Sequence, residues 1–233
     1  MWGVSKPLVL ACGALVAELR AVLTEQGLAD AVEVRYLPAN LHNRPEQIVP
    51  VLEVELATAG RDAADATAVD GAHDDATAGE GAATQHDDRT VLIGYADCGT
   101  GGMLDRWLDR LRLTMPNVVR LPGAHCYEFF SGAELFAAMH DEAPGTFYLT
   151  DFLAKHFDAL VWQGLGLDRH PQLRDAYFGN YTRVMLISQS TDEVVIDAGR
   201  SAAAHLGLAF EHRHVGRDGL GDAVNLTLTR KVA

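Results

Sequence analysis

Three cysteines are the residues of this chain with the clearest capacity for chemistry, and each follows an apolar run typical of a buried strand. Cys12 ends "LVLAC", Cys98 follows "VLIGYAD" and Cys126 follows "VVRLPGAH". Thiolates bind soft metals and act as nucleophiles, so three cysteines in one kind of setting suggest a common site. Their odd number also argues against a disulfide framework.

Strands and helices alternate around these cysteines. The strand over Leu8–Ala11 leads into a helix, and the strand over 90–96 leads through a glycine-rich loop into the helical pattern "MLDRWLDRLRL". Such alternation is typical of βαβ units and a parallel sheet. We therefore predict an α/β fold: a three-layer sandwich with a mainly parallel, Rossmann-like sheet, in a single domain over residues 1–233. Residues 208–215 and 223–230 are predicted edge strands.

Residues 58–89 differ in composition from the rest of the chain. They are rich in Ala, Asp, Gly and Thr and contain almost no large apolar side chain. A segment of this kind buries too little surface to offset the entropy lost on ordering. We therefore predict a disordered surface insertion over residues 58–89.

The predicted sheet brings the cysteines together. Ligands of open parallel sheets bind outside the carboxyl ends of the strands, and all three cysteines follow strand ends. His42 lies in the loop after the next predicted strand, at the same edge. We therefore predict Cys12, Cys98, Cys126 and His42 as metal ligands. Spacing leaves two cofactors open, a 4Fe–4S iron–sulfur cluster or zinc.

Further residues near these strand ends fit roles in binding or proton transfer. Glycines beside the cysteines permit a close backbone approach to a cofactor. The histidine and carboxylates nearby can carry protons or orient ligands. The predicted cofactor-binding glycines are Gly13, Gly99, Gly101 and Gly102, and the predicted catalytic residues are His125, Glu128 and Asp97.

Two hypotheses without a metal stay open beside this one. The first is a small-ligand-binding accessory protein, in which helix N-termini at the strand ends hold a small anion. The second is a cysteine hydrolase or transferase that uses Cys98 or Cys126 with His125 as the base. Whether the chain is an enzyme is not decided by these residues.

The overall charge and hydropathy exclude several classes of partner. The net charge is −13, whereas nucleic-acid binding needs a basic face, so we expect no nucleic acid. The apolar runs are too short to span a bilayer, so we expect no membrane partner. The N-terminus lacks a cleavable signal pattern, and we expect a soluble, cytoplasmic protein.

Five motifs carry a resemblance to a known family: "LACGALVAEL", "LPANLHNRPEQI", "IGYADCGTGG", "LPGAHCYEFFSG" and "APGTFYLTDFL". In this order they resemble the bacterial and archaeal family called domain of unknown function 1638. Members look associated with corrinoid-dependent methyltransferase systems, which implies a small-molecule substrate, partners from such a system and a role in one-carbon metabolism as enzyme or accessory protein. The family's recurring positions include Tyr95, which we add to the predicted cofactor-binding residues.

Overall fold

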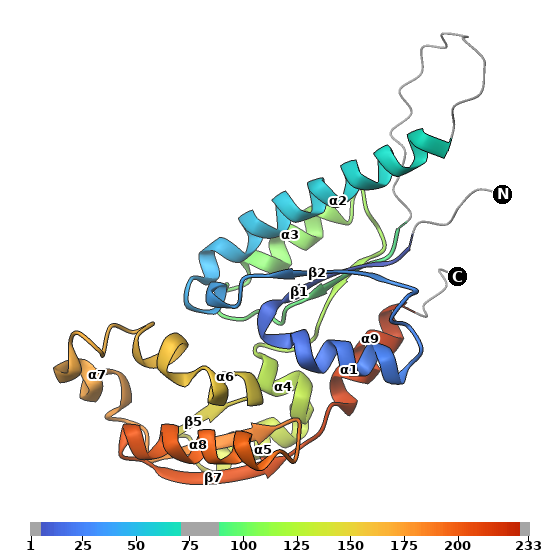
Figure 1. Ribbon diagram of the computed structural model, residues 1–233. Coiled ribbons are helices and arrows are strands. Elements are labelled where there is room, and N and C mark those ends of the chain that lie inside the picture. The colour runs from blue at the N-terminus through green and yellow to red at the C-terminus, as the bar shows by residue number, and fades with distance from the viewer. Residues whose placement is uncertain (1–5, 71–88, 229–233) are drawn as a thin grey trace, which may run out of the picture.

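The strands of the computed structural model, which describes residues 6–70 and 89–228, form two separate parallel sheets (Figure 1). Sheet A has the strand order β2-β1-β3-β4, and sheet B has the order β5-β6-β7. The strands of sheet A are β1 (Leu8–Cys12), β2 (Glu33–Leu37), β3 (Val91–Gly94) and β4 (Val118–Arg120). Those of sheet B are β5 (Thr146–Leu149), β6 (Arg183–Ser188) and β7 (Ala209–His214).

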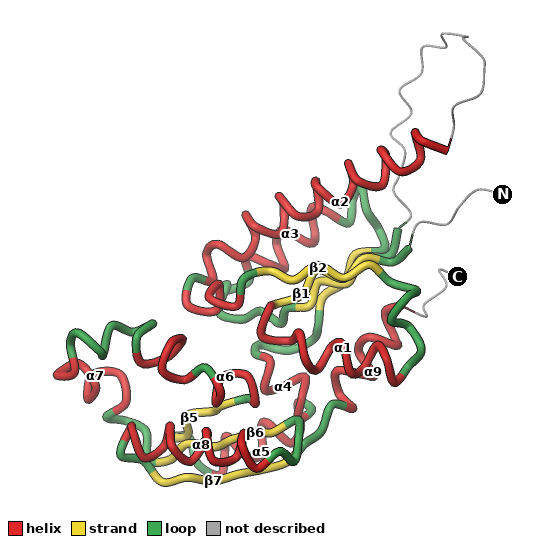
Figure 2. Tube along the Cα trace, in the orientation of Figure 1, coloured by secondary structure: helices red, strands yellow, loops and turns green. Residues whose placement is uncertain are grey.

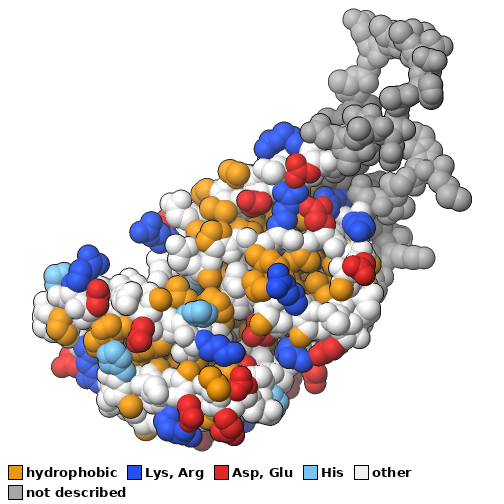
Figure 3. Space-filling model, in the orientation of Figure 1, with side chains coloured by type: hydrophobic (Ala, Val, Ile, Leu, Met, Phe, Trp, Pro, Cys, Tyr) orange, Lys and Arg blue, Asp and Glu red, His pale blue; other side chains and the backbone are white. Residues whose placement is uncertain are grey.

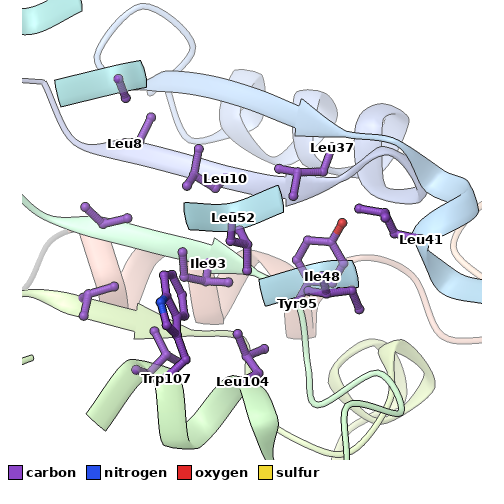
Figure 4. Close-up of a cluster of buried hydrophobic side chains, with 14 residues drawn as sticks. Leu8, Leu10, Leu37, Leu41, Ile48, Leu52, Ile93, Tyr95, Leu104 and Trp107 are labelled. Atoms are coloured by element: carbon purple, nitrogen blue, oxygen red, sulfur yellow. The ribbon is translucent and has the colours of Figure 1, made fainter. Parts of the chain in front are cut away.

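Helices cover both faces of sheet A. Figure 2 shows α2 (Ile48–Asp70) and α3 (Met103–Leu111) on one face, with α1 (Val16–Glu25) and α9 (Asp218–Leu228) on the other. Parallel strands that are buried on both faces are continuously apolar, as in β3, "VLIG". Figure 4 shows how Ile48 and Leu52 of α2 and Leu104 and Trp107 of α3 pack against strand residues in one of the two cores.

Sheet B is covered in the same manner by a second set of helices. One core combines α6 (Asp151–Lys155) and α8 (Glu193–Leu206) with one face of β6. On the other face, Met185 and Ile187 pack with Met139 of α5 (Ala133–Glu142) and Tyr127 of α4 (Cys126–Ser131). A short helix α7 (Arg174–Phe178) lies in the connection between α6 and β6.

The chain passes between the two sheets twice. It leaves sheet A through α4 and α5, builds sheet B, and returns after β7 to place α9 beside α1 (Figure 1). We call sheet A with its covering helices and α4, whose Phe129 and Phe130 pack in its core, the first lobe, and residues 133–215 the second lobe. Parallel strands in both lobes give each sheet its own carboxyl edge, where open sheets bind ligands.

The predicted α/β class, with parallel strands sandwiched by helices, is confirmed. The strands divide between two sheets, because α4 and α5 carry the chain away from β4 before β5 begins. Residues 223–228, which we predicted as part of an edge strand, are helical instead. Leu220 and Val224, four residues apart in α9, are both buried against α1, so a helical face decides this segment.

The segment that we predicted as an insertion begins within a helix. Residues 58–70 continue α2, where Ala59 is buried in the core and Asp62 pairs with Arg35 of β2. Alanine-rich sequence has a high helix propensity, which explains why α2 extends so far. Residues 71–88 lie outside the described part of the chain.

Among the described residues, no helix combines the length and the hydrophobicity that crossing a bilayer requires.

Candidate functional site

A small cavity lies where the carboxyl edge of sheet A meets α6 of the second lobe. It leaves about 30 Å³ for water-sized molecules, and about 490 Å³ when its mouth to solvent is included. The first lobe supplies the cysteines and most other walls, and the second lobe supplies the segment from Thr150 to Leu160. The lining residues are Cys12, Ala14, Leu15, Ala39, His42, Gly94, Tyr95, Cys98, Cys126, Phe129, Phe130, Thr150, Phe152, Leu153 and Leu160.

All three cysteines line this cavity, and all are half-buried, free thiols. Cys12 is the last residue of β1, Cys98 follows β3 and Cys126 is the first residue of α4. Two neighbouring loops run side by side here, since the backbone N–H of Cys98 donates to the carbonyl of Ala124 at 2.9 Å. The common strand edge of sheet A therefore brings three distant parts of the chain to one place.

The surroundings of the thiols favour the neutral form. Burial raises the pKa of Cys12 and Cys126, and it raises the pKa of Cys98 to about 12, with the neighbouring Cys12 adding to the effect. Apolar walls and nearby thiols both disfavour a negative charge. Because the thiolate is the reactive species, these cysteines are not prepared as nucleophiles.

The predicted three-cysteine metal site is wrong. Among residues 6–70 and 89–228, no group of three or more His, Cys, Asp and Glu side chains is arranged to hold a metal ion. A metal needs ligand atoms that converge on one point, whereas these thiols pack as wall residues against the two apolar cores of the first lobe. We therefore do not assign Cys12, Cys98, Cys126 and His42 as ligands of an iron–sulfur cluster or of zinc.

Tyr95 is the polar residue that the cavity leaves unsatisfied. Its side chain is 2% exposed, and its hydroxyl has no hydrogen-bond partner within residues 6–70 and 89–228 (Figure 4 shows the ring between Leu37 and Leu104). Burial raises the pKa of this hydroxyl, and the Cys12 thiol beside it adds to that effect, so the group is a neutral phenol. A buried hydroxyl without a partner costs about 1–3 kcal/mol.

The loop after β3 holds Cys98 in an unusual conformation. Among the described residues other than glycine, Cys98 alone has a positive φ, at 50°. The Asp97 carboxylate fixes this loop by accepting hydrogen bonds from the Thr100 hydroxyl at 2.6 Å and from the Gly102 N–H at 2.9 Å. Burial works against the charge of Asp97, but these hydrogen bonds outweigh it and hold its pKa below the ordinary value.

The predicted glycines serve this same local structure. Gly99, Gly101 and Gly102 all have positive φ angles, and the N–H of Gly101 also donates to Asp97. Gly13 lies against the neighbouring strand, where a Cβ atom would come within 2.7 Å of the Leu37 carbonyl oxygen. Loop geometry and, for Gly13, the close approach of a neighbouring strand thus explain why glycine occupies these positions without a cofactor. Their predicted cofactor-binding role stays a prediction.

His42 stands at the mouth of the cavity. Part of its ring is exposed, yet the surrounding walls lower its pKa, and the nearby His125 adds to this effect. The next residue, Asn43, donates from its side chain to the Leu160 carbonyl of the second lobe at 2.8 Å. The loop that carries His42 therefore joins the two lobes across the cavity mouth.

Glu128 points elsewhere. Its carboxylate accepts a hydrogen bond from the Ala124 N–H at 2.8 Å, and it lines a wider groove of about 980 Å³ beside β4 instead of the cysteine cavity. His125 stacks on Tyr127 with ring centroids 6.2 Å apart. The catalytic roles of Glu128, His125 and Asp97 stay predictions.

Sequence reasoning missed the contribution of the second lobe. Thr150, Phe152 and Leu160 line the cavity, although they follow β5 in a different sheet. The motif "YLTDFL" was the available signal, because its strand ends at the polar pair Thr150 and Asp151. The strands of the first lobe end at cysteines in a similar way. Only the position of sheet B against sheet A turns that signal into a shared site.

A family model described as "Protein of unknown function (DUF1638)" matches residues 36–224 of the chain. The chain belongs to this family. The match includes His42, Tyr95, Cys98 and Cys126, and it begins after Cys12. No curated protein and no solved structure matches the chain. Membership of the family thus supports the resemblance without adding an activity.

Proposed function

We propose that this chain binds a small molecule, without a metal, in the cavity between the carboxyl edge of sheet A and α6. The observation that carries the proposal is Tyr95, which lines this cavity and whose buried hydroxyl, beside the Cys12 thiol, has no hydrogen-bond partner that meets geometric criteria among the described residues. Buried polar groups in proteins are nearly always paired, so an unpaired one that lines a cavity marks a place for a ligand atom.

The strained backbone of Cys98 supports the same proposal. The left-handed backbone conformation costs a residue with a Cβ atom about 1–2 kcal/mol of conformational free energy, whereas glycine adopts it readily. The chain nevertheless holds a cysteine there, and that cysteine lines the cavity. Strain that persists at a cavity wall is characteristic of functional sites.

The position of the cavity also fits ligand binding. It lies at the carboxyl ends of parallel strands and between two lobes, and both are common places for small-molecule sites. Residues of both lobes line the cavity, so a bound molecule would contact both, and the Asn43–Leu160 hydrogen bond joins the lobes beside it. A small-molecule partner was also our prediction from the sequence, and the position of the cavity supports the proposal.

Other expectations stay predictions beside this proposal. Partners from a corrinoid methyltransferase system follow from the resemblance alone. A cytoplasmic location follows from composition, and the three free thiols support it. We do not propose a cysteine hydrolase or transferase, because the surroundings of all three thiols favour the neutral form.

Retention of a metabolite tests the proposal. The intact chain is incubated with a protein-free extract of small metabolites, washed by gel filtration and analysed by mass spectrometry for bound compounds. We expect the wild type to retain a compound that Tyr95→Phe does not retain. Tyr95→Phe should unfold at the same or higher denaturant concentration than the wild type, because it removes an unpaired buried hydroxyl.

Tyr148→Phe is the matched control. The Tyr148 hydroxyl is also buried without a hydrogen-bond partner, but it packs in the second lobe with Met139 and Ile187, away from the cavity. This variant should retain the same compound as the wild type. Retention by Tyr95→Phe as well, or no retention by the wild type, would overturn the proposal.

A further inference from the structure

We infer that the cavity selects an uncharged molecule: an apolar body with a hydrogen-bonding group that meets Tyr95. This inference rests on the proposed function and specifies the class of its ligand. It differs from the small anion that helix N-termini would favour. The charge and the polarity of the walls decide between these two ligand classes.

No charged side chain lines the cavity within the described part of the chain. The walls contain three thiols, one phenol, one imidazole, one threonine and otherwise apolar residues, and none is Asp, Glu, Lys or Arg. An ion that enters such a site loses its hydration and gains no partner of opposite charge, which is strongly unfavourable. An uncharged molecule loses much less.

The titratable wall residues are held neutral as well. Burial favours the protonated form of the three thiols and the unprotonated form of His42. The charged groups that influence the Cys98 thiol from outside, Asp97 and Arg120, act in opposite directions on its pKa. Both are engaged elsewhere, Asp97 with its own loop and Arg120 with Asp105 at 2.6 Å.

The helix starts at the cavity offer little to an anion. The N–H of Ala14, at the start of the turn that leads into α1, already donates to the Cys12 sulfur at 3.5 Å. The N–H of Leu153 in α6 donates to the Thr150 hydroxyl, and α6 begins with the carboxylate of Asp151. The backbone donors that would hold an anion are thus partly occupied, and an acidic residue stands beside them.

The walls suit an apolar body. Phe129 and Phe130 come from the first lobe, and Phe152 comes from the second. Over the described residues of the face seen in Figure 3, acidic and basic side chains are interspersed, without a large area of one sign to attract ions. The polar atom available inside is the Tyr95 hydroxyl, which can donate or accept one hydrogen bond.

Thiol modification by reagents of one shape and different charge tests this inference. The probes are the 2-hydroxyethyl, 2-aminoethyl and 2-sulfonatoethyl methanethiosulfonates, which are neutral, cationic and anionic. Each transfers its substituted ethylthio group to a cysteine sulfur that has lost its proton to solvent, forms a mixed disulfide and releases methanesulfinate. A reference thiol is placed in the same molecule by Leu113→Cys, since Leu113 is 79% exposed and is not one of the cavity walls.

Modification rates at the cavity thiols are measured by peptide mass spectrometry and divided by the rate at residue 113. High salt screens the net charge of the protein. We expect this relative rate to be at least about tenfold higher for the neutral reagent than for either charged one, which corresponds to a difference of about 1.4 kcal/mol. An equal or higher relative rate for a charged reagent, or no reaction with the neutral reagent, would overturn the inference.

The two proposals can fail separately. Charge selection in the modification experiment without a retained metabolite would leave an uncharged cavity that is not a binding site. A retained metabolite with no charge selection would leave a binding site whose ligand class is not the one inferred. Repeating the modification with Tyr148→Phe controls for general loosening of the fold, because that variant should keep the same ratio of rates.

Discussion

The carboxyl edges of the two sheets share one topology but differ in how their polar groups are satisfied. At the edge of sheet B, the Asp151 carboxylate accepts hydrogen bonds from the Gln189 N–H, the Ser190 N–H and the Ser190 hydroxyl, at 3.0, 2.9 and 2.7 Å. The Gln189 side chain accepts from the Asp151 N–H and donates to the Ile187 carbonyl. This buried edge is closed by its own hydrogen bonds.

At the edge of sheet A, the loop around Asp97 is hydrogen-bonded, but other buried polar groups are left open. The Tyr95 hydroxyl has no partner, and three neutral thiols and a strained Cys98 line the cavity beside it. Topology therefore shows where a ligand can bind, and the state of the polar groups is our argument for the edge of sheet A. Under the proposed function, the edge of sheet B stabilises the fold, whereas the edge of sheet A sacrifices stability for binding.

The largest effect should follow from opening the closed edge. Asp151→Ala leaves the N–H groups of Gln189 and Ser190 buried without acceptors, and we expect it to lower the free energy of unfolding by roughly 3 kcal/mol. Urea denaturation measures this loss.

Asp97→Ala is the counterpart at the edge of sheet A. Asp97 also accepts hydrogen bonds from its loop, but it is partly exposed, so water replaces the lost carboxylate and we expect a loss of about 1 kcal/mol. Equal losses for the two variants would contradict the distinction between a closed and an open edge.

Much of this comparison could be predicted from the sequence, because strand ends are visible in it. Apolar runs that stop at Cys12, Cys98 and Cys126 place those residues at one edge of a parallel sheet, and the structure places all three on one cavity. The α/β class follows from the same alternation. Local sequence patterns therefore predict where each residue lies along its strand.

Pairing between distant elements could not be predicted in the same way. The alternation of strands and helices does not show that α4 and α5 lead to a second sheet. The sequence therefore did not predict that Phe152 and Leu160 line the cavity. The alternation in residues 223–230 also suggested a strand, whereas burial of Leu220 and Val224 against α1 selects a helix. The prediction of a metal site failed for a related reason. A position at the end of a strand does not decide whether the sulfur atoms of three cysteines converge on one point.

The border between the two edges contains a buried carboxylate that should make stability depend on pH. Glu18 of α1 is 7% exposed, and one of its oxygens has no hydrogen-bond partner. Burial raises its pKa above the ordinary 4.5, and Asp151 raises it further, whereas Lys155 and Arg217 lower it. Tyr36 is the remaining titratable group that its charge influences.

The sign follows from the raised pKa. Below pH 4.5 Glu18 is largely protonated in both the folded and the unfolded chain, and its contribution to stability is fully present. As the pH rises, the unfolded chain ionises first, so this contribution declines until the pH passes the pKa of the folded state. Each tenfold change in proton affinity is worth about 1.4 kcal/mol.

Glu18→Gln should remove this dependence. We expect the variant to be more stable than the wild type at pH 8 and to approach it below pH 4.5, as measured by urea denaturation across this range. Parallel stability curves for the two proteins would show that the carboxylate of Glu18 is already solvated or paired. Glu134→Gln, at an exposed position of α5, is the control that should leave the pH dependence nearly unchanged.

The smallest effect concerns the strain at the open edge. Cys98→Gly relieves the left-handed backbone conformation, and we expect the free energy of unfolding to rise by about 1 kcal/mol. Cys98→Ala removes the same thiol but keeps the Cβ atom, so it should bring no such gain. Thermal and urea denaturation of the two variants measure the difference.

The pair separates strain from the loss of the thiol. If Cys98→Gly is more stable than Cys98→Ala, while both lose the metabolite that the wild type retains, the chain keeps a cysteine in an unfavourable conformation for the sake of binding. Equal stability of the two variants would mean that the loop fixed by Asp97 holds φ at 50° without cost. The edge of sheet A would then differ from the edge of sheet B only in the unpaired Tyr95 hydroxyl.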